Sequence, residues 1–168
     1  TGKMAMLIAQ NGPGVTGFVT CVKTAYWNHT PMLLVTPQAA NKTMGQGGFQ
    51  EMPQMSLFED CVCYQEEVRD PSRMAEVLNR VIERAWRGSA PAQINVPRDF
   101  FTHQIDIDLP QIVRLERPAG GVEAVTRAAQ MLSEAKFPVI LSGAGVVIGD
   151  AIGECAVLAE RVDAPVCS

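Results

Sequence analysis

Short apolar runs alternate with segments of helical periodicity along the whole chain, and this alternation restricts the fold more than any other feature. Each run has the length of a strand and is bounded by Gly, Pro or polar residues, which is typical of strands buried on both faces. The expected strands are residues 4–10, 31–36, 92–96, 138–142 and 164–167. The pattern predicts an α/β chain with a mainly parallel sheet.

Two of the segments between the strands, residues 15–27 and 122–135, have one apolar stripe each and are predicted to be helices. A further helix is expected at about residues 150–162. The residues predicted to face inward are Val15, Phe18, Val22 and Tyr26 in the first helix and Val122, Val125, Ala129 and Leu132 in the second.

Another helix is predicted to start at Asp70 and Pro71, because a carboxylate accepts from free helical amides and proline needs no donor at the first position. We expect it to end at Gly88 in a left-handed cap. Its predicted buried stripe is Met74, Val77, Leu78, Val81, Ile82 and Ala85.

The composition argues against several classes of protein. With 47% hydrophobic residues and a net charge of −4, the chain is expected to be globular and not to bind nucleic acid. The apolar runs are too short to cross a bilayer, and the N-terminus has no secretion signal. The five irregularly spaced cysteines are expected to be free thiols, which favours a cytoplasmic location.

Two loops that follow neighbouring strands are candidate ligand sites. Residues 10–17 contain a Gly-Pro-Gly turn that opens a helix, where backbone can approach a ligand closely; a tight structural turn would have the same sequence. Residues 38–53 are long and glycine-rich; a mobile surface loop is the alternative. We expect both loops at the same edge of the sheet.

Together the two loops have a more specific pattern. NGPGVTGFVTCVKTAYWNHTPMLLVT, followed by GFQE and later by APAQINVPRD, resembles the pyrimidine-binding domain of thiamine diphosphate enzymes of the acetolactate synthase type. GQGGFQEMPQMSLFEDCVCYQEEVRDPSR and GSAPAQINVPRDFFTHQIDI are similar to the sulfoacetaldehyde acetyltransferase branch of that family. Where acetolactate synthases often have asparagine after this turn, the chain has Gly17, which weakens the acetolactate synthase interpretation.

The resemblance covers essentially the whole chain and implies its domain organisation. Residues 1–101 would be the later part of a three-layer parallel-sheet pyrimidine domain, 102–117 a linker, and 118–168 the start of a Rossmann-like central domain. Both ends are expected to be internal to a longer polypeptide, because residue 1 directly precedes a buried strand and the second unit ends after two strands.

The resemblance also implies roles for individual residues. Pro13 and Gln50 would approach the pyrimidine ring of the cofactor, Asn11 and Thr16 are further cofactor-binding candidates, and Phe49 would line the substrate pocket. The family's catalytic glutamate would lie before Thr1, so no catalytic residue is expected in the chain itself.

Other conspicuous residues receive structural interpretations. Glu51 is expected to order its loop and not to replace the catalytic glutamate. Cys61 and Cys63 suit one face of a strand better than a metal site, and the family's Mg²⁺ ligands would lie in a C-terminal domain. The Gly143-Ala144-Gly145 segment fits a tight turn better than a dinucleotide-binding motif. Lys42 is a candidate for sulfonate contact, with a solvated surface charge as the alternative.

The resemblance implies an acyltransferase that converts sulfoacetaldehyde and phosphate to acetyl phosphate and sulfite with thiamine diphosphate and Mg²⁺. It also implies a homo-oligomer, a dimer or tetramer, with no nucleic-acid or membrane partner. The alternatives are a 2-oxo acid enzyme such as acetolactate synthase or pyruvate oxidase, and a non-catalytic α/β binding module. The isolated chain is expected to be inactive.

Overall fold

The computed structural model describes residues 3–110 and 120–168, which form two compact units. The predicted linker, residues 102–117, lies outside the described residues from position 111 onward. No helix in the described ranges is long and apolar enough to span a membrane.

The first unit is built on a four-stranded sheet in which all strands are parallel. The strands are β1 (Ala5–Ile8), β2 (Met32–Gln38), β3 (Tyr64–Glu67) and β4 (Pro91–Pro97), in the order β1-β2-β4-β3. Strand β2 pairs with β1 on one side and with β4 on the other. This arrangement confirms the predicted α/β class and puts the segments that follow β1 and β2 at one edge of the sheet.

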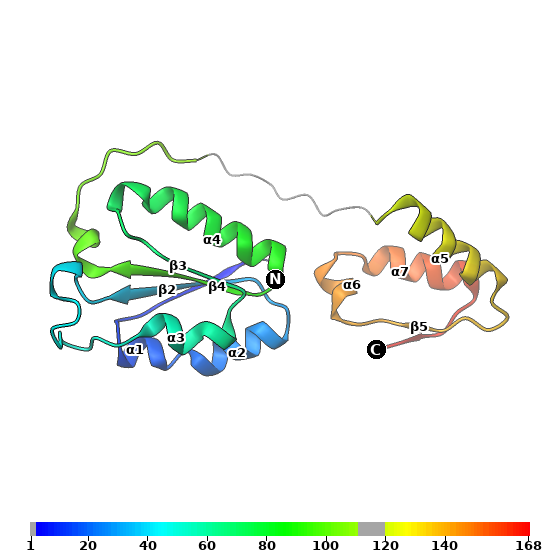
Figure 1. The fold of residues 1–168 in the computed structure, drawn as a ribbon. Coiled ribbons are helices and arrows are strands. Elements are labelled where there is room, and N and C mark those ends of the chain that lie inside the picture. Colours follow the sequence, from blue (N-terminus) through cyan, green and yellow to red (C-terminus); the bar gives the residue numbers. More distant parts are fainter. Residues whose placement is uncertain (1–2, 111–119) are drawn as a thin grey trace. The chain divides into compact units, whose positions relative to one another are not determined.

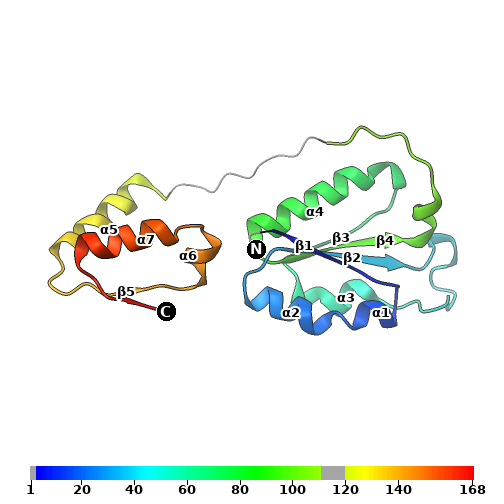
Figure 2. The same cartoon turned by 180° about the vertical axis from the view of Figure 1, so that it is seen from behind.

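Helices cover both faces of this sheet, giving three layers (Figures 1 and 2). On one face lie α1 (Pro13–Thr16), α2 (Val19–Trp27) and α3 (Gln54–Phe58), and on the other lies α4 (Met74–Gly88). Short 3₁₀ helices complete the connections at Asn41–Thr43, Glu59–Cys61, Pro71–Arg73 and Arg98–Thr102.

Each helical layer encloses its own apolar core against the sheet. The α4 side includes Val77, Val81 and Ala85 of the helix, as its sequence pattern predicted, while the partners of that stripe, Leu78 and Ile82, are half-buried. The opposite side is centred on fully buried residues of α1, α2, β2 and α3, namely Val15, Val22, Leu34 and Phe58. Burying each such side chain favours folding by roughly 1.5–3 kcal/mol, so both layers are firmly attached.

The predicted ends of this helix are shifted in the structure. The Asp70 side chain accepts from the Ser72 amide at 2.8 Å, but it caps the 3₁₀ helix Pro71–Arg73, which leads into α4 at Met74. The left-handed residue at the C-terminus is Ser89, with φ 47°, and not Gly88. Gly88 is still helical, and a Cβ there would lie 2.9 Å from Cys63 Sγ, so close packing explains this glycine.

Two further expectations for the first unit are wrong, and one strand was missed. Strand β1 is not covered on both faces: Met6 and Ile8 are 61% and 52% exposed. Cys61 lies in a 3₁₀ helix and Cys63 precedes β3, so the two cysteines do not share one strand face. Strand β3 itself has no apolar run and was not predicted.

Apart from one additional short helix, α6 (Ala144–Ile148), the second unit has the predicted order of elements, but it does not have the predicted burial. It contains α5 (Val122–Glu134), β5 (Ile140–Leu141), α6, α7 (Ile152–Val162) and β6 (Val166–Cys167), with β5 and β6 parallel. None of its described residues, 120–168, is buried. Val122, Val125 and Ala129 are exposed and Leu132 is half-buried, although the sequence placed all four inward.

The glycine-containing segment of this unit also differs from the expectation. The sequence predicted a tight turn at residues 143–145, but Gly143 is the N-cap of α6, and Ala144 and Gly145 are already helical. The short helix α6 therefore begins directly after β5.

Candidate functional site

The two predicted loops meet at the carboxyl edge of the first sheet. The Gly-Pro-Gly turn follows β1 and the glycine-rich loop follows β2, and these strands are parallel neighbours. The Asn11 side chain donates from Nδ2 to the Gln50 carbonyl at 3.1 Å and to the Phe49 carbonyl at 3.4 Å. Asn11 is buried, so these bonds are shielded from water. The predicted convergence of the two turns is confirmed.

The backbones of the turn and the loop are packed too closely to admit a side chain between them. Gly12 has φ 69°, and a Cβ at this position would lie 2.8 Å from the Gln50 carbonyl oxygen and 2.9 Å from Gln50 Cβ. Glycine is required at residue 12 for both reasons, because L-residues disfavour this φ and the space is occupied.

Gln50 carries an unsatisfied polar group at this junction. Its backbone is left-handed, with φ 59°, and its side-chain Oε1 is buried without a hydrogen-bond partner among the described residues. A buried acceptor without a donor is costly and usually marks a ligand contact or an ordered water. The amino group of an aminopyrimidine is a donor of the kind that Oε1 lacks.

The other predicted site residues lie around this junction and differ in their exposure and hydrogen bonding. Pro13 and Thr16 are exposed, and the Thr16 hydroxyl donates to the Pro13 carbonyl at 2.9 Å, which holds the first turn of α1. The Phe49 side chain is 73% exposed. The Asn11 amide group is engaged with the loop, so it supports the site as a tether.

Glu51 orders the glycine-rich loop. Its Oε1 accepts from the Gly45 amide at 2.6 Å and its Oε2 from the Gly48 amide at 3.0 Å. Gly45 has φ 84°, a conformation that glycine adopts readily. These bonds provide the loop-ordering role that the sequence predicted for this residue.

A buried polar network lies behind the two loops and was not predicted. Gln54, at the start of α3, accepts from the Gly12 amide at 3.2 Å and donates to the Pro37 carbonyl at 2.6 Å. The network continues through side chains of β2, β3 and β4, which are Thr36, Gln65, Glu67, Gln93 and Asn95. Of these, Thr36, Gln93 and Asn95 are completely buried. The sequence gives one indication of this network, because the predicted strand AQINV contains the polar residues Gln93 and Asn95 among apolar ones.

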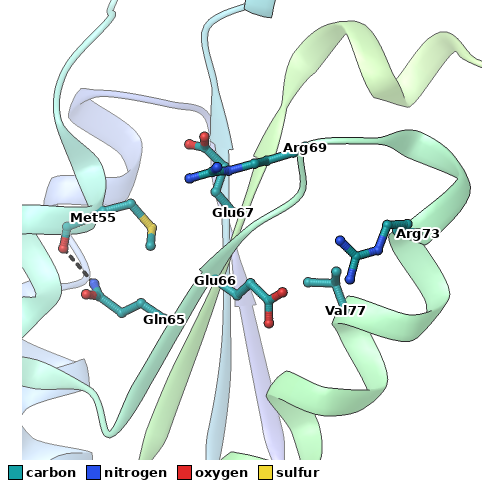
Figure 3. A pocket seen from close by; sticks show the side chains of 7 residues that line it. All are labelled: Met55, Gln65, Glu66, Glu67, Arg69, Arg73 and Val77. Atoms are coloured by element: carbon teal, nitrogen blue, oxygen red, sulfur yellow. Dashed lines mark hydrogen bonds between the residues drawn. The ribbon is translucent and has the colours of Figure 1, made fainter.

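A cavity of about 500 Å³ lies beside β3 and the start of α4 (Figure 3). Glu66 on its wall is held by Arg80, whose Nη2 lies 2.6 Å from Glu66 Oε1. This hydrogen bond with Arg80 lowers the pKa of Glu66, and the bond from Tyr64 to Glu66 raises the pKa of Tyr64. The remaining lining residues are Met55, Gln65, Glu67, Arg69, Arg73 and Val77.

Metal-ligating and basic candidates do not gather at the junction. Within residues 3–110 and 120–168, no three His, Cys, Asp or Glu side chains are placed to hold a metal ion together. Lys42 is exposed on the glycine-rich loop. All five cysteines are free.

Comparisons with known proteins give this geometry a context. Residues 1–57 match the family model of the thiamine pyrophosphate enzyme N-terminal TPP binding domain, and residues 125–168 match that of the thiamine pyrophosphate enzyme central domain. The chain belongs to the thiamine pyrophosphate enzyme family. The N-terminal match contains both the Gly-Pro-Gly turn and the loop that carries Gln50.

Among thiamine pyrophosphate enzymes, the relatives differ clearly in identity. A probable sulfoacetaldehyde acetyltransferase of Rhizobium meliloti (strain 1021) is 75% identical over 99% of this chain, and the chain spans 28% of the relative's length. The sulfoacetaldehyde acetyltransferase of Castellaniella defragrans is 48% identical over 99% of the chain. A probable acetolactate synthase large subunit of Methanocaldococcus jannaschii is 32% identical over the whole chain, which spans 30% of that protein.

Solved structures of thiamine pyrophosphate enzymes share the fold. The thiamine diphosphate-dependent 4-hydroxybenzoylformate decarboxylase of Rhodococcus jostii RHA1 aligns over 98% of this chain and 32% of its own, with a TM-score of 0.86 and 18% identity. At this identity the likeness concerns the fold alone.

Proposed function

We propose that the chain is part of a sulfoacetaldehyde acetyltransferase, which converts sulfoacetaldehyde and phosphate to acetyl phosphate and sulfite. The observation that carries the proposal is the identity of 75% with relatives of that name, against 32% with an acetolactate synthase. The position of Gly17, where acetolactate synthases often have asparagine, supports the same choice.

The proposed cofactor is thiamine diphosphate with Mg²⁺, whose metal ligands would lie outside this chain. When bound, the cofactor supplies the carbon nucleophile and the electron sink for breaking the bond to sulfite. The residues of this chain would bind and orient its pyrimidine ring: Gln50 through its unpaired buried Oε1, and Pro13 through the exposed turn next to it. Asn11 and Thr16 would hold that turn and loop in place through their side-chain hydrogen bonds.

The remaining surface of the junction would serve the substrate. Phe49, exposed on the loop beside Gln50, would line the reaction pocket and exclude water from it. Lys42, on the same loop, is a candidate for contact with the sulfonate group. The family's catalytic glutamate is not assigned to any residue of this chain.

The proposal includes a domain assignment and a setting in the cell. Residues 1–101 would be pyrimidine domain, 102–117 a linker and 118–168 central domain, supported by the two family matches and the two compact units. We further propose a cytoplasmic homo-oligomer, a dimer or tetramer, in sulfonate metabolism. The free cysteines support the cytoplasmic location.

The test uses the polypeptide encoded by the complete reading frame that contains residues 1–168. With thiamine diphosphate, Mg²⁺, sulfoacetaldehyde and phosphate, we expect release of sulfite together with an equal amount of acetyl phosphate. Consumption of pyruvate without sulfite release would instead assign a 2-oxo acid enzyme. Absence of both activities with no binding of thiamine diphosphate would favour a non-catalytic module.

The chain of 168 residues on its own provides a second test of the assignment. It is expected to release no sulfite, because the family's catalytic glutamate and metal ligands are not among its assigned residues. Measurable turnover by this chain alone would contradict the proposed distribution of roles.

A further inference from the structure

Among the described residues, the Gly12 amide has one hydrogen-bond partner, which is the Gln54 side chain. Gly12 is buried, and its carbonyl, not its N–H, takes part in α1 by accepting from the Thr16 amide at 3.0 Å. The N–H donates instead to Gln54 Oε1 at 3.2 Å. A buried N–H without an acceptor is strongly disfavoured, so this contact determines where the turn can sit.

Gln54 makes this contact from a fixed position. Its side chain is fully buried, and its Nε2 donates to the Pro37 carbonyl at 2.6 Å, at the end of β2. The same Nε2 lies 3.5 Å from Asn95 Oδ1 on the central strand β4. One amide group therefore joins the turn after β1 to the ends of β2 and β4.

The orientation of this amide is fixed by its neighbours. Asn95 donates from Nδ2 to Glu67 Oε2 at 2.7 Å, so its Oδ1 faces Gln54 and also accepts from the Thr36 hydroxyl at 2.7 Å. The Pro37 carbonyl and Asn95 Oδ1 are acceptors and require the NH₂ group of Gln54 on their side. Oε1 is consequently presented to Gly12, and a flipped amide would place two donors face to face.

From this geometry we infer that Gln54 is a positioning residue for the Gly12–Pro13 turn, and through it for the pyrimidine ring of the cofactor. It touches neither the cofactor nor the substrate in this assignment, and it acts by holding the turn against Gln50. The part of the inference that concerns the cofactor rests on the proposed function; the part that concerns the turn does not.

Amide hydrogen exchange on the ¹⁵N-labelled chain tests the hold on the turn without any cofactor. Gln54→Met keeps the side-chain volume and removes both hydrogen-bonding groups, so Gly12 is expected to exchange at least about tenfold faster. Gln93→Met is the matched control: Gln93 is an equally buried glutamine of the same network, which does not contact Gly12 and reaches Gln54 only at its backbone carbonyl, at 3.5 Å. In that variant Gly12 should keep its protection.

A second variant covers the case in which Gln54→Met does not fold. Gln54→Asn retains the amide but is one methylene too short to span from α3 to Gly12, and should likewise release the Gly12 amide. Protection of Ile94 in β4 serves as the measure of an intact fold. Unchanged Gly12 exchange in a folded Gln54 variant would overturn the inference.

The effect on the cofactor is measured in the enzyme encoded by the complete reading frame. Gln54→Asn is expected to raise the thiamine diphosphate concentration for half-maximal activity about tenfold, with kcat at saturating cofactor within about twofold, because the turn is mispositioned but present. A loss confined to kcat would contradict a positioning role. An enzyme that uses no thiamine diphosphate would refute the proposed function while leaving the exchange result at Gly12 valid.

Discussion

At the residue scale, Gly12 and Gln50 pack so closely that no side chain fits on residue 12. Gly12 and Gln50 are 38 positions apart in sequence, and both have positive φ, 69° and 59°. Gly12 adopts this conformation without a side chain, whereas Gln50 adopts it with one and at an energetic cost. Backbone strain of this kind is concentrated at ligand sites, which agrees with the unpaired Oε1 of Gln50.

Gly12→Ala is predicted to destabilise the first unit by at least about 2 kcal/mol, since it combines an unfavourable φ with a steric clash. Gly47→Ala is the matched control: its φ is 72°, but nothing lies within 4 Å of the added methyl group. The control should lose only about 1 kcal/mol. Urea unfolding measures both, and equal losses would mean that the contact with Gln50 is unimportant.

A second glycine supports packing between helix and sheet. Gly88→Ala would normally stabilise a helix by about 1 kcal/mol, but here we predict a net loss, because the new Cβ meets Cys63 Sγ at 2.9 Å. In a Cys63→Ala background the same substitution should cost less. A double-mutant cycle by urea unfolding measures the coupling, and additive effects would disprove the clash.

The position of the two loops could be predicted from the sequence, whereas the polar network behind them could not. Asn11, Pro13 and Gln50 belong to short motifs in loops, where residue type and function are closely linked. Gln54 and Asn95 lie in segments whose neighbours are apolar, and only the fold shows that their amides face each other. Long-range pairing of this kind leaves no local pattern.

At the element scale, β3 is the strand that periodicity did not predict. Its sequence, YQEE, has no apolar alternation, because its side chains are matched to partners on other elements. Glu66 pairs with Arg80 of α4, and Glu67 accepts from Asn95 of β4. A polar strand in a sheet is stable when such partners exist, and they are visible only after folding.

The Arg80–Glu66 pair is predicted to make a pH-dependent contribution to stability. The pKa of Glu66 is lowered from 4.5 by its hydrogen bond with Arg80, so the contribution is present above about pH 4.5 and is lost as the pH falls through the lowered value. Arg80→Met also removes the 2.7 Å pair with Glu76 within α4, which persists at pH 3 because the pKa of Glu76 is lowered to about 2 by its hydrogen bonds with Arg73 and Arg80. The substitution should therefore cost about 0.5–1 kcal/mol at pH 7 and less, but not nothing, at pH 3. Urea unfolding at both pH values measures this difference.

Arg87→Met provides the control for this prediction. Arg87 pairs with Glu83 at 2.7 Å within α4, but its side chain is 64% exposed and the pair connects no second element. Its removal should cost at most about 0.5 kcal/mol. If Arg80→Met costs no more than this, or costs the same at pH 3 as at pH 7, the Arg80–Glu66 pair does not make the predicted contribution to stability.

At the scale of the whole molecule, the two units differ in how much of their apolar surface is enclosed. The first has fully buried side chains on both faces of its sheet, while none of the described residues 120–168 is buried. Periodicity predicted the elements of both units, since it depends on local spacing. Periodicity could not predict whether another surface covers the apolar stripe of a helix. For this reason the prediction that Val122 and Val125 are buried was wrong.

The two units are therefore predicted to unfold separately. Amides of β4 should show the slowest hydrogen exchange, and those of α5 should exchange at least about a hundredfold faster, because local stability follows buried contacts. Urea unfolding, followed by hydrogen exchange measured on peptides that cover nearly the whole chain, should show two transitions. The first should occur in residues 120–168. A single transition shared by both ranges would refute this independence.

The hydrogen bonds from Asn11 to the Phe49 and Gln50 carbonyls link the Gly-Pro-Gly turn to the glycine-rich loop. Because one amide group makes both bonds, a molecule that immobilises Pro13 will also restrain the backbone around residues 45–50. A ligand bound at the Gly-Pro-Gly turn should therefore slow proteolytic cleavage within residues 45–50. Limited proteolysis can be used to detect binding.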